Sequence, residues 1–487
     1  MDNEQVEVRK AKLKKISEKV KAYPERYETT HKLSEVASLE DGTQNVSIAG
    51  RILAKRGHGK MAFIVLSDIE GKAQASMKYD LLGEEKFNFF MDNIDIGDFI
   101  GVTGEVFTTH TGEKTVRAAD YTFLGKCLRP LPEKWHGLVD IEACYRQRYL
   151  DLIMNDETKR RFLLRTKLVA SIRSFLQGKG FLEVETPILQ SKPSGALARP
   201  FITHHNALDI DVYLRIAPET YLKRLVVGGF TNVFEIGRCF RNEGISKNHL
   251  QDFTMIEGYS AYYNYKDNMK LMQEMFKYIL NELFGTLTIK IGDKEIDFSK
   301  DWKELSFKDA ILRDCGIDID KHENEKTLLA EIKEKGIQLE CDNVESLGKG
   351  NLIDQLYKKV SRPSIIEPTF LVAHPIDLSP LARANDDDPS LTDRFQLVVN
   401  GVEIVNAYSE LVDPQEQRKR LEVQAASNAK GDEEAMVKDD DYILAMEYGM
   451  PPISGWGMGI DRLLQLLLEQ DNIRDGVLFP LMRPLED

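Results

Sequence analysis

The sequence predicts an α+β protein in which a small N-terminal β-barrel precedes a larger domain of mixed helices and strands. Short stretches of alternating apolar and polar residues follow one another between residues 46 and 117, and glycine turns separate them. A proline-rich segment at residues 128–137 then breaks the pattern in the manner of a linker. Helices and strands mix beyond it. We therefore expect a lead-in at 1–40, a barrel at 41–127, a linker at 128–140 and a main domain at 141–487.

The lead-in begins with a concentration of positive charge. Basic residues cluster in Arg9-Lys-Ala-Lys-Leu-Lys-Lys15 and continue at Lys19 and Lys21. This stretch predicts a helix, and Pro24 ends it because proline lacks the backbone N–H that a helix interior requires. The residues leave two interpretations open, a solvated basic helix and a helix that contacts a nucleic-acid backbone. The net charge of −14 argues against general nucleic-acid binding, although net charge averages over local patches.

Five strands are expected in the barrel segment. They are Val46-Ser-Ile-Ala-Gly-Arg-Ile52, Ala62-Phe-Ile-Val-Leu66, Ala73-Gln-Ala-Ser-Met77, Phe99-Ile-Gly-Val-Thr103 and Lys114-Thr-Val-Arg117. Five short strands pack naturally as an oligonucleotide-binding (OB) barrel. Phe63 and Gln74 lie on neighbouring strands, and Glu113 precedes the last one. An aromatic ring can stack on a splayed base while amide and carboxylate groups read its edge. From composition alone, however, Phe63 is more often a core residue.

Composition limits the class of protein. The 487 residues are 42% hydrophobic, enough to bury large cores in two or three domains. No apolar run reaches the roughly 20 residues of a membrane span, and the N-terminus is polar, so a cytoplasmic protein is expected. The five cysteines are widely spaced without a Cys-x-x-Cys pair, and they predict reduced thiols rather than a zinc site or disulfides: Cys127, Cys144, Cys239, Cys315 and Cys341.

The most informative segment of the larger domain is Phe234-Glu-Ile-Gly-Arg-Cys-Phe-Arg-Asn-Glu-Gly244, followed by Phe253-Thr-Met-Ile-Glu-Gly-Tyr259. We expect a strand, a loop and a second strand. Arg241 and Glu243 should share one strand face, and Glu257 and Tyr259 another. An arginine on a rigid strand can clamp a phosphate or carboxylate, and a phenylalanine after the loop offers a flat face for a purine. An exposed hairpin with surface salt bridges is the alternative.

Two further segments complete a set. Gly455-Trp-Gly-Met-Gly-Ile-Asp-Arg-Leu-Leu464 places glycines at alternate positions before an apolar helical run, and these glycines allow close approach of the backbone. The other segment is Gly180-Phe-Leu-Glu-Val-Glu-Thr-Pro187. Along the chain, the segments at 180–187, 234–259 and 455–464 resemble, in that order, motifs 1, 2 and 3 of the class II aminoacyl-tRNA synthetases. That resemblance implies an antiparallel sheet flanked by helices.

Other segments resemble the lysyl-tRNA synthetases within that class. They are Tyr145-Arg-Gln-Arg-Tyr-Leu-Asp-Leu152, Ala198-Arg-Pro-Phe-Ile-Thr-His-His-Asn206, Leu214-Arg-Ile-Ala-Pro-Glu219, Leu378-Ser-Pro-Leu-Ala382 and Asn406-Ala-Tyr-Ser-Glu-Leu411. The resemblance runs from about Tyr23 to Pro484. It implies an enzyme that activates L-lysine with ATP to lysyl-adenylate and pyrophosphate, and then transfers lysine to the 3′ end of tRNA(Lys). It also favours a tRNA backbone contact for the basic helix.

The resemblance assigns roles to individual residues. Arg241 and Arg462 are the catalytic cations, and the ATP site comprises Arg241, Glu243, His249, Phe253, Glu403 and Arg462. The lysine site comprises Gly195, Glu219, Arg241, Glu257, Tyr259, Asn406 and Glu410. The anticodon site comprises Phe63, Gln74 and Glu113, with Arg56 a weaker candidate. A structural salt bridge with an arginine is the alternative role for Glu410.

The chain departs from the family pattern at several positions. Magnesium should bridge the ATP phosphates through Glu403, but the second expected glutamate is Gln396. Lys114 stands where leucine is usual, and Ser194-Gly195 replaces a common Gly-Gly pair. The motif 2 loop carries Asn248 and reads His249-Leu-Gln-Asp-Phe253 instead of His-Asn-Pro-Glu-Phe.

The resemblance further implies a homodimer through motif 1, whose helix we expect to begin near Arg165. Residues 287–363 look like a helical insertion to which we assign no chemistry.

Two other functions remain. An aspartyl or asparaginyl synthetase shares the barrel and all three motifs, but it needs cations rather than Glu257 and Glu410 around its substrate. An inactive tRNA-binding paralogue is disfavoured by the retained catalytic residues.

Overall fold

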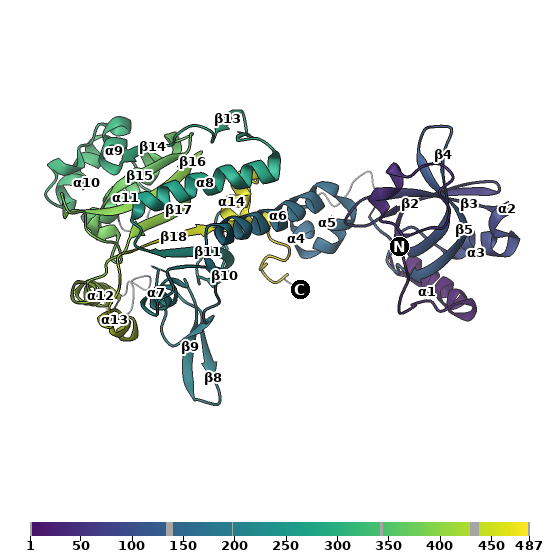
Figure 1. Ribbon diagram of the computed structural model, residues 1–487, viewed down its shortest axis with the longest axis horizontal. Helices are drawn as coiled ribbons and strands as arrows, with labels where there is room; N and C mark the ends of the chain where they lie inside the picture. Colours follow the sequence, from purple (N-terminus) through teal and green to yellow (C-terminus); the bar gives the residue numbers. More distant parts are fainter. Residues whose placement is uncertain (1, 133–139, 197, 341–343, 429–437, 486–487) are drawn as a thin grey trace. The chain divides into compact units, whose positions relative to one another are not determined.

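The structure, a computed structural model, describes residues 2–132, 140–196, 198–340, 344–428 and 438–485. These form two compact units that divide between Lys159 and Arg160 (Figure 1). Residues 133–139 of the expected linker and Cys341 lie outside the described residues. The predicted α+β class, with a five-stranded barrel and a large antiparallel sheet flanked by helices, is confirmed. The domain boundaries drawn from the sequence stay predictions.

The first unit is built around a closed barrel with strand order β1-β2-β3-β5-β4. Its strands are β1 Val46–His58, β2 Met61–Ser67, β3 Lys72–Lys78, β4 Phe99–Thr108 and β5 Lys114–Gly125. Each contains one of the five predicted stretches and extends beyond it. Alternate side chains point inward, as the period of two requires, so that Ile48, Ile64 and Val102 are fully buried in the barrel core. The helices of this unit are α1 Asp2–Lys19, α2 Tyr79–Leu82, α3 Glu84–Asn93, α4 Ile141–Arg146 and α5 Arg148–Met154, together with a 3₁₀ helix at Leu33–Ser38.

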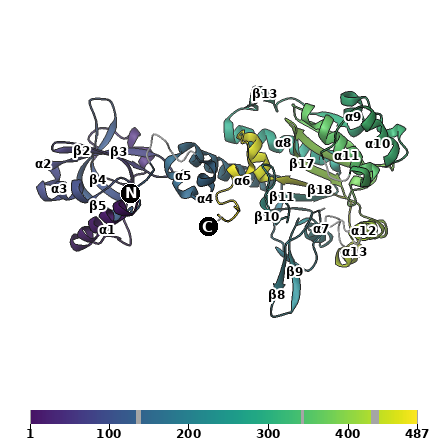
Figure 2. The same ribbon diagram turned by 180° about the vertical axis from the view of Figure 1, so that it is seen from behind.

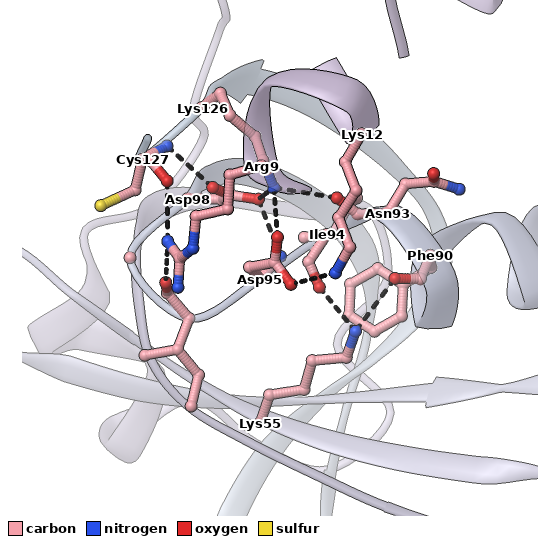
Figure 3. Close-up of polar contacts among 12 residues, drawn as sticks. Arg9, Lys12, Lys55, Phe90, Asn93, Ile94, Asp95, Asp98, Lys126 and Cys127 are labelled. Carbon is pink, nitrogen blue, oxygen red and sulfur yellow. Dashed lines mark hydrogen bonds and ion pairs between the residues drawn. The ribbon is translucent and has the colours of Figure 1, made fainter. Parts of the chain in front are cut away.

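The basic helix α1 packs against the barrel (Figure 2). Ile16 is buried in the barrel core, and Arg9 donates hydrogen bonds to the backbone carbonyls of Ile96 and Cys127 (Figure 3). Lys12 pairs with Asp95 at 2.6 Å. Residues 9, 12 and 16 share one helix face, so part of the positive charge of α1 serves to hold the helix in place.

A buried ion-pair cluster lies beneath this contact (Figure 3). The Lys126 side chain has no exposed surface, and its ammonium donates to Asp95 at 2.6 Å, to Asp98 at 2.7 Å and to the Asn93 carbonyl at 2.9 Å. Lys55 donates to three carbonyls at the end of α3, and burial lowers its pKa to about 8. The segment between α3 and β4 is therefore held largely by lysine side chains.

Replacing Lys126 should destabilise this unit without touching the larger one. Lys126→Met leaves the buried Asp98 carboxylate without its cation, and breaking such a pair costs about 3–5 kcal/mol. We expect hydrogen exchange of peptides from α1 and β4 to become at least 100-fold faster in the full chain. The control is Lys19→Met, which removes a half-exposed partner of Glu85 and should change exchange little. Equal exchange in both variants would contradict the prediction.

The second unit contains an eight-stranded sheet with the order β14-β15-β16-β17-β18-β11-β10-β6. All neighbours are antiparallel except the two outermost pairs, β14–β15 and β10–β6. The strands are β6 Leu182–Glu183, β10 Asn232–Phe240, β11 Asp252–Ala261, β14 Lys303–Ser306, β15 Thr369–Pro375, β16 Leu391–Val399, β17 Val402–Ser409 and β18 Ile453–Gly459. A small second sheet comprises β7 Leu189–Gln190, β8 Ile202–His205 and β9 Ile210–Leu214.

Three helices pack on one face of the large sheet (Figure 1). They are α6 Asp156–Gly178, α8 Tyr265–Phe284 and α14 Ile460–Leu467. Their apolar side chains form the main core with Phe234, Ile256 and Met458 of the strands. The neighbouring strand residues therefore point to the opposite face, where α7 Glu219–Val227 packs and where the candidate site lies. The motif 1 helix begins at Asp156, earlier than the predicted start near Arg165.

The remaining elements lie at the edges of the second unit. The expected insertion at 287–363 contains strands as well as helices: β12 Thr288–Ile291, β13 Lys294–Asp297, β14, α9 Phe307–Cys315, α10 Glu325–Glu334 and α11 Lys349–Val360. Short 3₁₀ helices occur at Ile319–Lys321, Val344–Ser346, Arg362–Ser364, Ile376–Leu378 and Ile473–Gly476. Helices α12 Pro414–Asn428 and α13 Asp440–Glu447 follow β17, and α13 contacts α7. Within the described ranges, no helix is long and apolar enough to cross a membrane.

Candidate active site

A cavity of about 350 Å³ opens on the sheet face opposite α6, α8 and α14. Strands β11, β17 and β18 form its floor, because residues at alternate positions of these strands point away from the helical core. Gly455 and Gly457 keep the floor low: a Cβ on Gly455 would lie 2.2 Å from the Tyr259 ring. The alternate glycines of the third motif therefore make room, as predicted.

The motif 2 arginine lies at one end of this cavity. β10 ends at Phe240, so Arg241 and Glu243 lie in the loop, and the prediction that they share a strand face is wrong. The backbone N–H of Arg241 still bonds to Gln251 across the loop at 2.9 Å, which fixes the position of the arginine. A strand that pairs only as far as Phe240 leaves the loop free to bend over the cavity.

Arg241 and Phe253 lie together in the cavity wall. The Arg241 guanidinium is 5.1 Å from the centre of the Phe253 ring, and its Nε is buried without a hydrogen-bond partner among the described residues. A buried Nε without a partner is costly unless a ligand completes its hydrogen bonding. Phe253 is the second residue of β11 and offers the ring face that a purine requires. This end of the cavity suits an anionic, aromatic ligand.

A second arginine is nearby. Arg462, on the first turn of α14, lines the cavity and donates to the Glu403 carbonyl at 3.4 Å. His249 lines the same region, and its imidazole contacts Ser246 at 2.8 Å. Burial, together with the positive charge of Arg462, lowers the pKa of His249, so this histidine is neutral at pH 7. The positive charge here is thus carried by Arg241 and Arg462.

The other end of the cavity is acidic. Glu257 and Tyr259 are adjacent on the cavity face of β11, as predicted, and the Tyr259 hydroxyl donates to Glu257 at 3.1 Å. Burial, followed by the charge of Glu219, raises the pKa of Glu257 to about 8. A carboxyl group with such a pKa is poised to ionise when a cation binds beside it.

Glu219 also lines this acidic end of the cavity. It begins α7, and its carboxylate accepts a hydrogen bond from the Tyr408 hydroxyl at 2.6 Å. Gly195 lies opposite with a φ of +92°, and a Cβ there would approach that of Glu219 at 3.0 Å. A glycine is required at this position for both reasons. Both residues line the cavity, as the sequence predicts for an amine site.

Asn406 lies between the two ends. Its side-chain oxygen accepts a hydrogen bond from Arg394 at 2.9 Å, so its NH₂ group is left to donate. Arg394 is held in turn by the Leu378 carbonyl and the Ser379 hydroxyl. Both Asn406 and Arg394 line the cavity. The arrangement presents an amide donor where a substrate carboxylate is expected.

Glu410 differs from the other predicted lysine-site residues. It follows β17 and is buried behind the cavity wall, where it forms an ion pair with Lys223 of α7. Lys223 also contacts Glu219 at 2.5 Å. The alternative role predicted for Glu410 is a salt bridge with an arginine, but its partner in the structure is a lysine. Burial raises the pKa of Glu410, and the charge of Lys223 opposes that rise.

The structure offers few protein ligands for magnesium. Glu403 lines the cavity and a neighbouring hollow of about 440 Å³ that Arg462 also lines. Gln396 faces Asn406 across the β16–β17 pair but does not line the cavity. No group of three or more His, Cys, Asp or Glu residues is placed to hold a metal ion within the described parts of the chain. One carboxylate suits an ion that retains waters and relies on substrate phosphates.

The predicted anticodon residues gather on the outside of the barrel. Phe63 is half-buried and lies outside the barrel core, with Arg56 as its cross-strand neighbour. Gln74 on β3 accepts a hydrogen bond from Thr115 of β5 at 3.4 Å, and Glu113 is exposed just before β5. Lys114 pairs with Asp41 at 2.8 Å. The core interpretation of Phe63 is therefore wrong, and its ring is available for stacking.

Two charged residues of the site were not predicted from the sequence. Arg394 lies in the segment that predicted only a metal ligand, Gln396. Lys223 follows Glu219 by four residues on α7, a spacing that favours an ion pair. That spacing, in a stretch that includes the buried Leu222 and Val226, is the signal that could have found it.

Comparisons with known proteins agree with this geometry. The family described as tRNA synthetases class II (D, K and N) matches residues 140–483, and an OB-fold nucleic acid binding domain matches residues 46–124. A lysine–tRNA ligase of Carboxydothermus hydrogenoformans is 48% identical over 99% of this chain and 98% of its own. Those of Bacillus subtilis and Aquifex aeolicus are 45% and 47% identical, covering 99% and 94% of this chain and 97% and 76% of their own. The chain belongs to the class II tRNA synthetases of the D, K and N group.

Proposed function

We propose that the protein activates L-lysine with ATP to lysyl-adenylate and pyrophosphate, and then transfers lysine to the 3′ end of tRNA(Lys). The observation that carries this proposal is the polarity of the cavity. Its one end holds the cations of Arg241 and Arg462 beside the Phe253 ring, and its other end holds Glu257 and Glu219. A substrate with two ammonium groups matches the acidic end, whereas aspartate or asparagine requires cations there.

In this proposal the enzyme works by position and charge. A carboxylate oxygen of lysine attacks the α-phosphorus of ATP, and the bond to the pyrophosphate oxygen breaks. Arg241 and Asn406 orient the lysine carboxylate, and Arg241 also neutralises charge on the α-phosphate. Arg462 and the neutral His249 lie by the departing phosphates. Phe253 stacks on the adenine and Glu243 accepts from its amino group. Gly195 and Glu219 bind the α-amine, and Glu257, Tyr259 and Glu410 select the ε-ammonium.

The barrel supplies the second half of the function. Phe63, Gln74 and Glu113, with Arg56 beside them, form an outward surface that fits a splayed, uridine-rich anticodon. Lys14 and Lys15 of α1 are exposed, as is Lys21 just beyond the helix, whereas the exposed Lys10 and Lys19 pair with Glu7 and Glu85. Lys14, Lys15 and Lys21 are therefore the residues proposed to contact the tRNA backbone. The enzyme is proposed to act in the cytoplasm.

Charging of tRNA tests this proposal directly. The full-length protein should transfer lysine to a tRNA transcript with a lysine anticodon, and should transfer neither aspartate nor asparagine. Phe63→Ala should reduce this charging at least tenfold while leaving lysine activation unchanged. Charging with aspartate or asparagine would contradict lysine as the substrate and identify that amino acid in its place. Binding of tRNA with neither activation nor charging would favour the inactive tRNA-binding paralogue.

We propose that Mg²⁺ binds to the ATP phosphates through Glu403, with Gln396 contributing at most a neutral oxygen. A glutamine carries no charge, so the affinity for the ion should be low at one of its sites. Gln396→Glu is expected to lower the magnesium concentration for half-maximal ATP–pyrophosphate exchange about three- to tenfold. The rate at saturating magnesium should be unchanged, which makes it the internal control. An unaltered magnesium dependence would contradict the idea.

We also propose a homodimer through motif 1. The strand β6 is an edge of the large sheet, and exposed apolar side chains surround it, with Leu182 55%, Ile188 44% and Leu189 52% exposed. Such apolar groups at a sheet edge favour an interface with a second copy. Sedimentation velocity at micromolar concentration should give a dimer, and Leu182→Glu should shift it to the monomer. A monomeric wild-type protein would rule out this assembly.

A further inference from the structure

A positive charge that no substrate supplies is built into the acidic end of the cavity. The side chain of Lys223 is fully buried on α7, and its ammonium contacts the carboxylates of Glu219 and Glu410. The ammonium also lies 5.6 to 5.8 Å from the ring centres of three tyrosines, Tyr259, Tyr408 and Tyr442. These five residues, together with Glu257 on β11, are the described titratable groups that face it from α7, α13, β11 and the end of β17.

The surroundings keep Lys223 charged. Burial alone would lower the pKa of Lys223, but the carboxylates of Glu219 and Glu410 outweigh burial and raise its pKa well above the ordinary range. Lys223 does not line the cavity, whereas its partner Glu219 does. The ammonium is therefore a fixed internal charge that reaches the ligand only through other residues.

We infer that Lys223 is a positioning residue for lysine selection, an internal counter-ion whose ammonium holds the carboxylates of Glu219 and Glu410 in place. This inference rests on the proposed function. Three carboxylates, those of Glu219, Glu257 and Glu410, face the single ammonium of Lys223. Glu219 and Glu257, the two of these carboxyl groups that line the cavity, then remain for a substrate that brings two ammonium groups. Without Lys223, carboxylates this close would share a proton, and the pocket would lose the arrangement that receives lysine.

The primary test is Lys223→Met, which keeps the length of the side chain and removes its charge. In lysine-dependent ATP–pyrophosphate exchange, the KM for lysine should rise at least 30-fold, while the KM for ATP stays within threefold. The pH at which the lysine KM levels off should move upward by about one unit. Lys126→Met is the matched control, because Lys126 is equally buried between two carboxylates on the barrel. It should leave both lysine KM and pH profile unchanged.

A second comparison keeps the inference testable if the single variant Lys223→Met does not fold. It sets the double variant Lys223→Met/Glu410→Gln, which lacks one charge of each sign, against the single variant Glu410→Gln. If Lys223 acts as the counter-ion of Glu410, adding Lys223→Met to Glu410→Gln should raise the lysine KM less than tenfold. An increase of 30-fold or more in that background would overturn the inference.

The remaining outcomes separate the inference from the proposed function. Normal wild-type exchange with a lysine KM in Lys223→Met within threefold of wild type would overturn the inference alone. A fall in kcat with an equal rise in the KM for ATP and an unshifted pH profile would also overturn the inference, because that pattern indicates a purely structural effect. Absence of lysine-dependent exchange in the wild-type protein would overturn the proposed function and the inference together.

Discussion

Arg241→Ala is expected to lower the rate of lysine-dependent ATP–pyrophosphate exchange at least 100-fold. Arg241 is the one cation that the structure places both at the motif 2 loop and against the Phe253 ring, within the described residues that line the cavity. Loss of a preorganised charge at a reacting phosphate costs about 3–4 kcal/mol of transition-state stabilisation. Arg241→Lys should recover little of the exchange rate that Arg241→Ala loses, because an ammonium cannot make two parallel hydrogen bonds.

Arg238→Ala is the control for this prediction. Arg238 lies on β10, shortly before Arg241 in the chain, but forms a half-exposed pair with Asp252 at 3.2 Å, outside the cavity. Its removal should change exchange less than twofold. Thermal unfolding of Arg241→Ala should match that of the wild type, since no described residue accepts a hydrogen bond from the buried Arg241 Nε. An Arg241→Ala variant with near-normal kcat would exclude this residue from the chemistry.

Lysine binding should improve as the pH rises towards 8. Burial raises the pKa of Glu257 to about 8, so below that pH the carboxyl must lose its proton before it pairs with the ε-ammonium. The KM for lysine should therefore fall about tenfold per pH unit from pH 6 to pH 8 and then level off. Glu257→Gln should abolish this dependence and lower kcat/KM for lysine about 100-fold at pH 8.

The same carboxyl should affect stability in the opposite sense. The pKa of Glu257 is raised on folding from its ordinary value of 4.5. Its contribution to the free energy of unfolding is full below pH 4.5 and is lost as the pH rises through about 8. Glu257→Gln without lysine should thus unfold at a higher temperature than the wild type at pH 8.5, and at a similar temperature at pH 5. The measurement is calorimetry at both pH values. Equal unfolding temperatures of the two proteins at pH 8.5 would contradict the prediction.

Strand periodicity explains how much of the site could be predicted. Glu257 and Tyr259 were placed on one face because side chains alternate along a strand, and β11 does continue through both. Arg241 lay too close to the end of its strand for that argument, since pairing stops at Phe240. The position of a strand end depends on the loop and its partner, which alternation does not reveal.

Burial of charge was the part that sequence could not supply. A lysine on a helix ordinarily lies in solvent, whereas Lys223 is buried between Glu219 on its own helix and Glu410, which approaches from the end of β17. That contact joins residues far apart in the chain and depends on the packing of α7 against the sheet. For Phe63, composition alone favoured the core and the family resemblance favoured an outward ring, because composition cannot tell which side of a barrel strand is outside.

The central claim is that the acidic end of the cavity selects lysine for activation. The most direct measurement is ATP–pyrophosphate exchange by the purified protein with lysine, ornithine, arginine, aspartate and asparagine, each across a magnesium series. We predict exchange with lysine and at least 100-fold lower kcat/KM with the others. Exchange with aspartate or asparagine in place of lysine would contradict the claim, and exchange with none of them would leave a protein that binds tRNA without activating an amino acid.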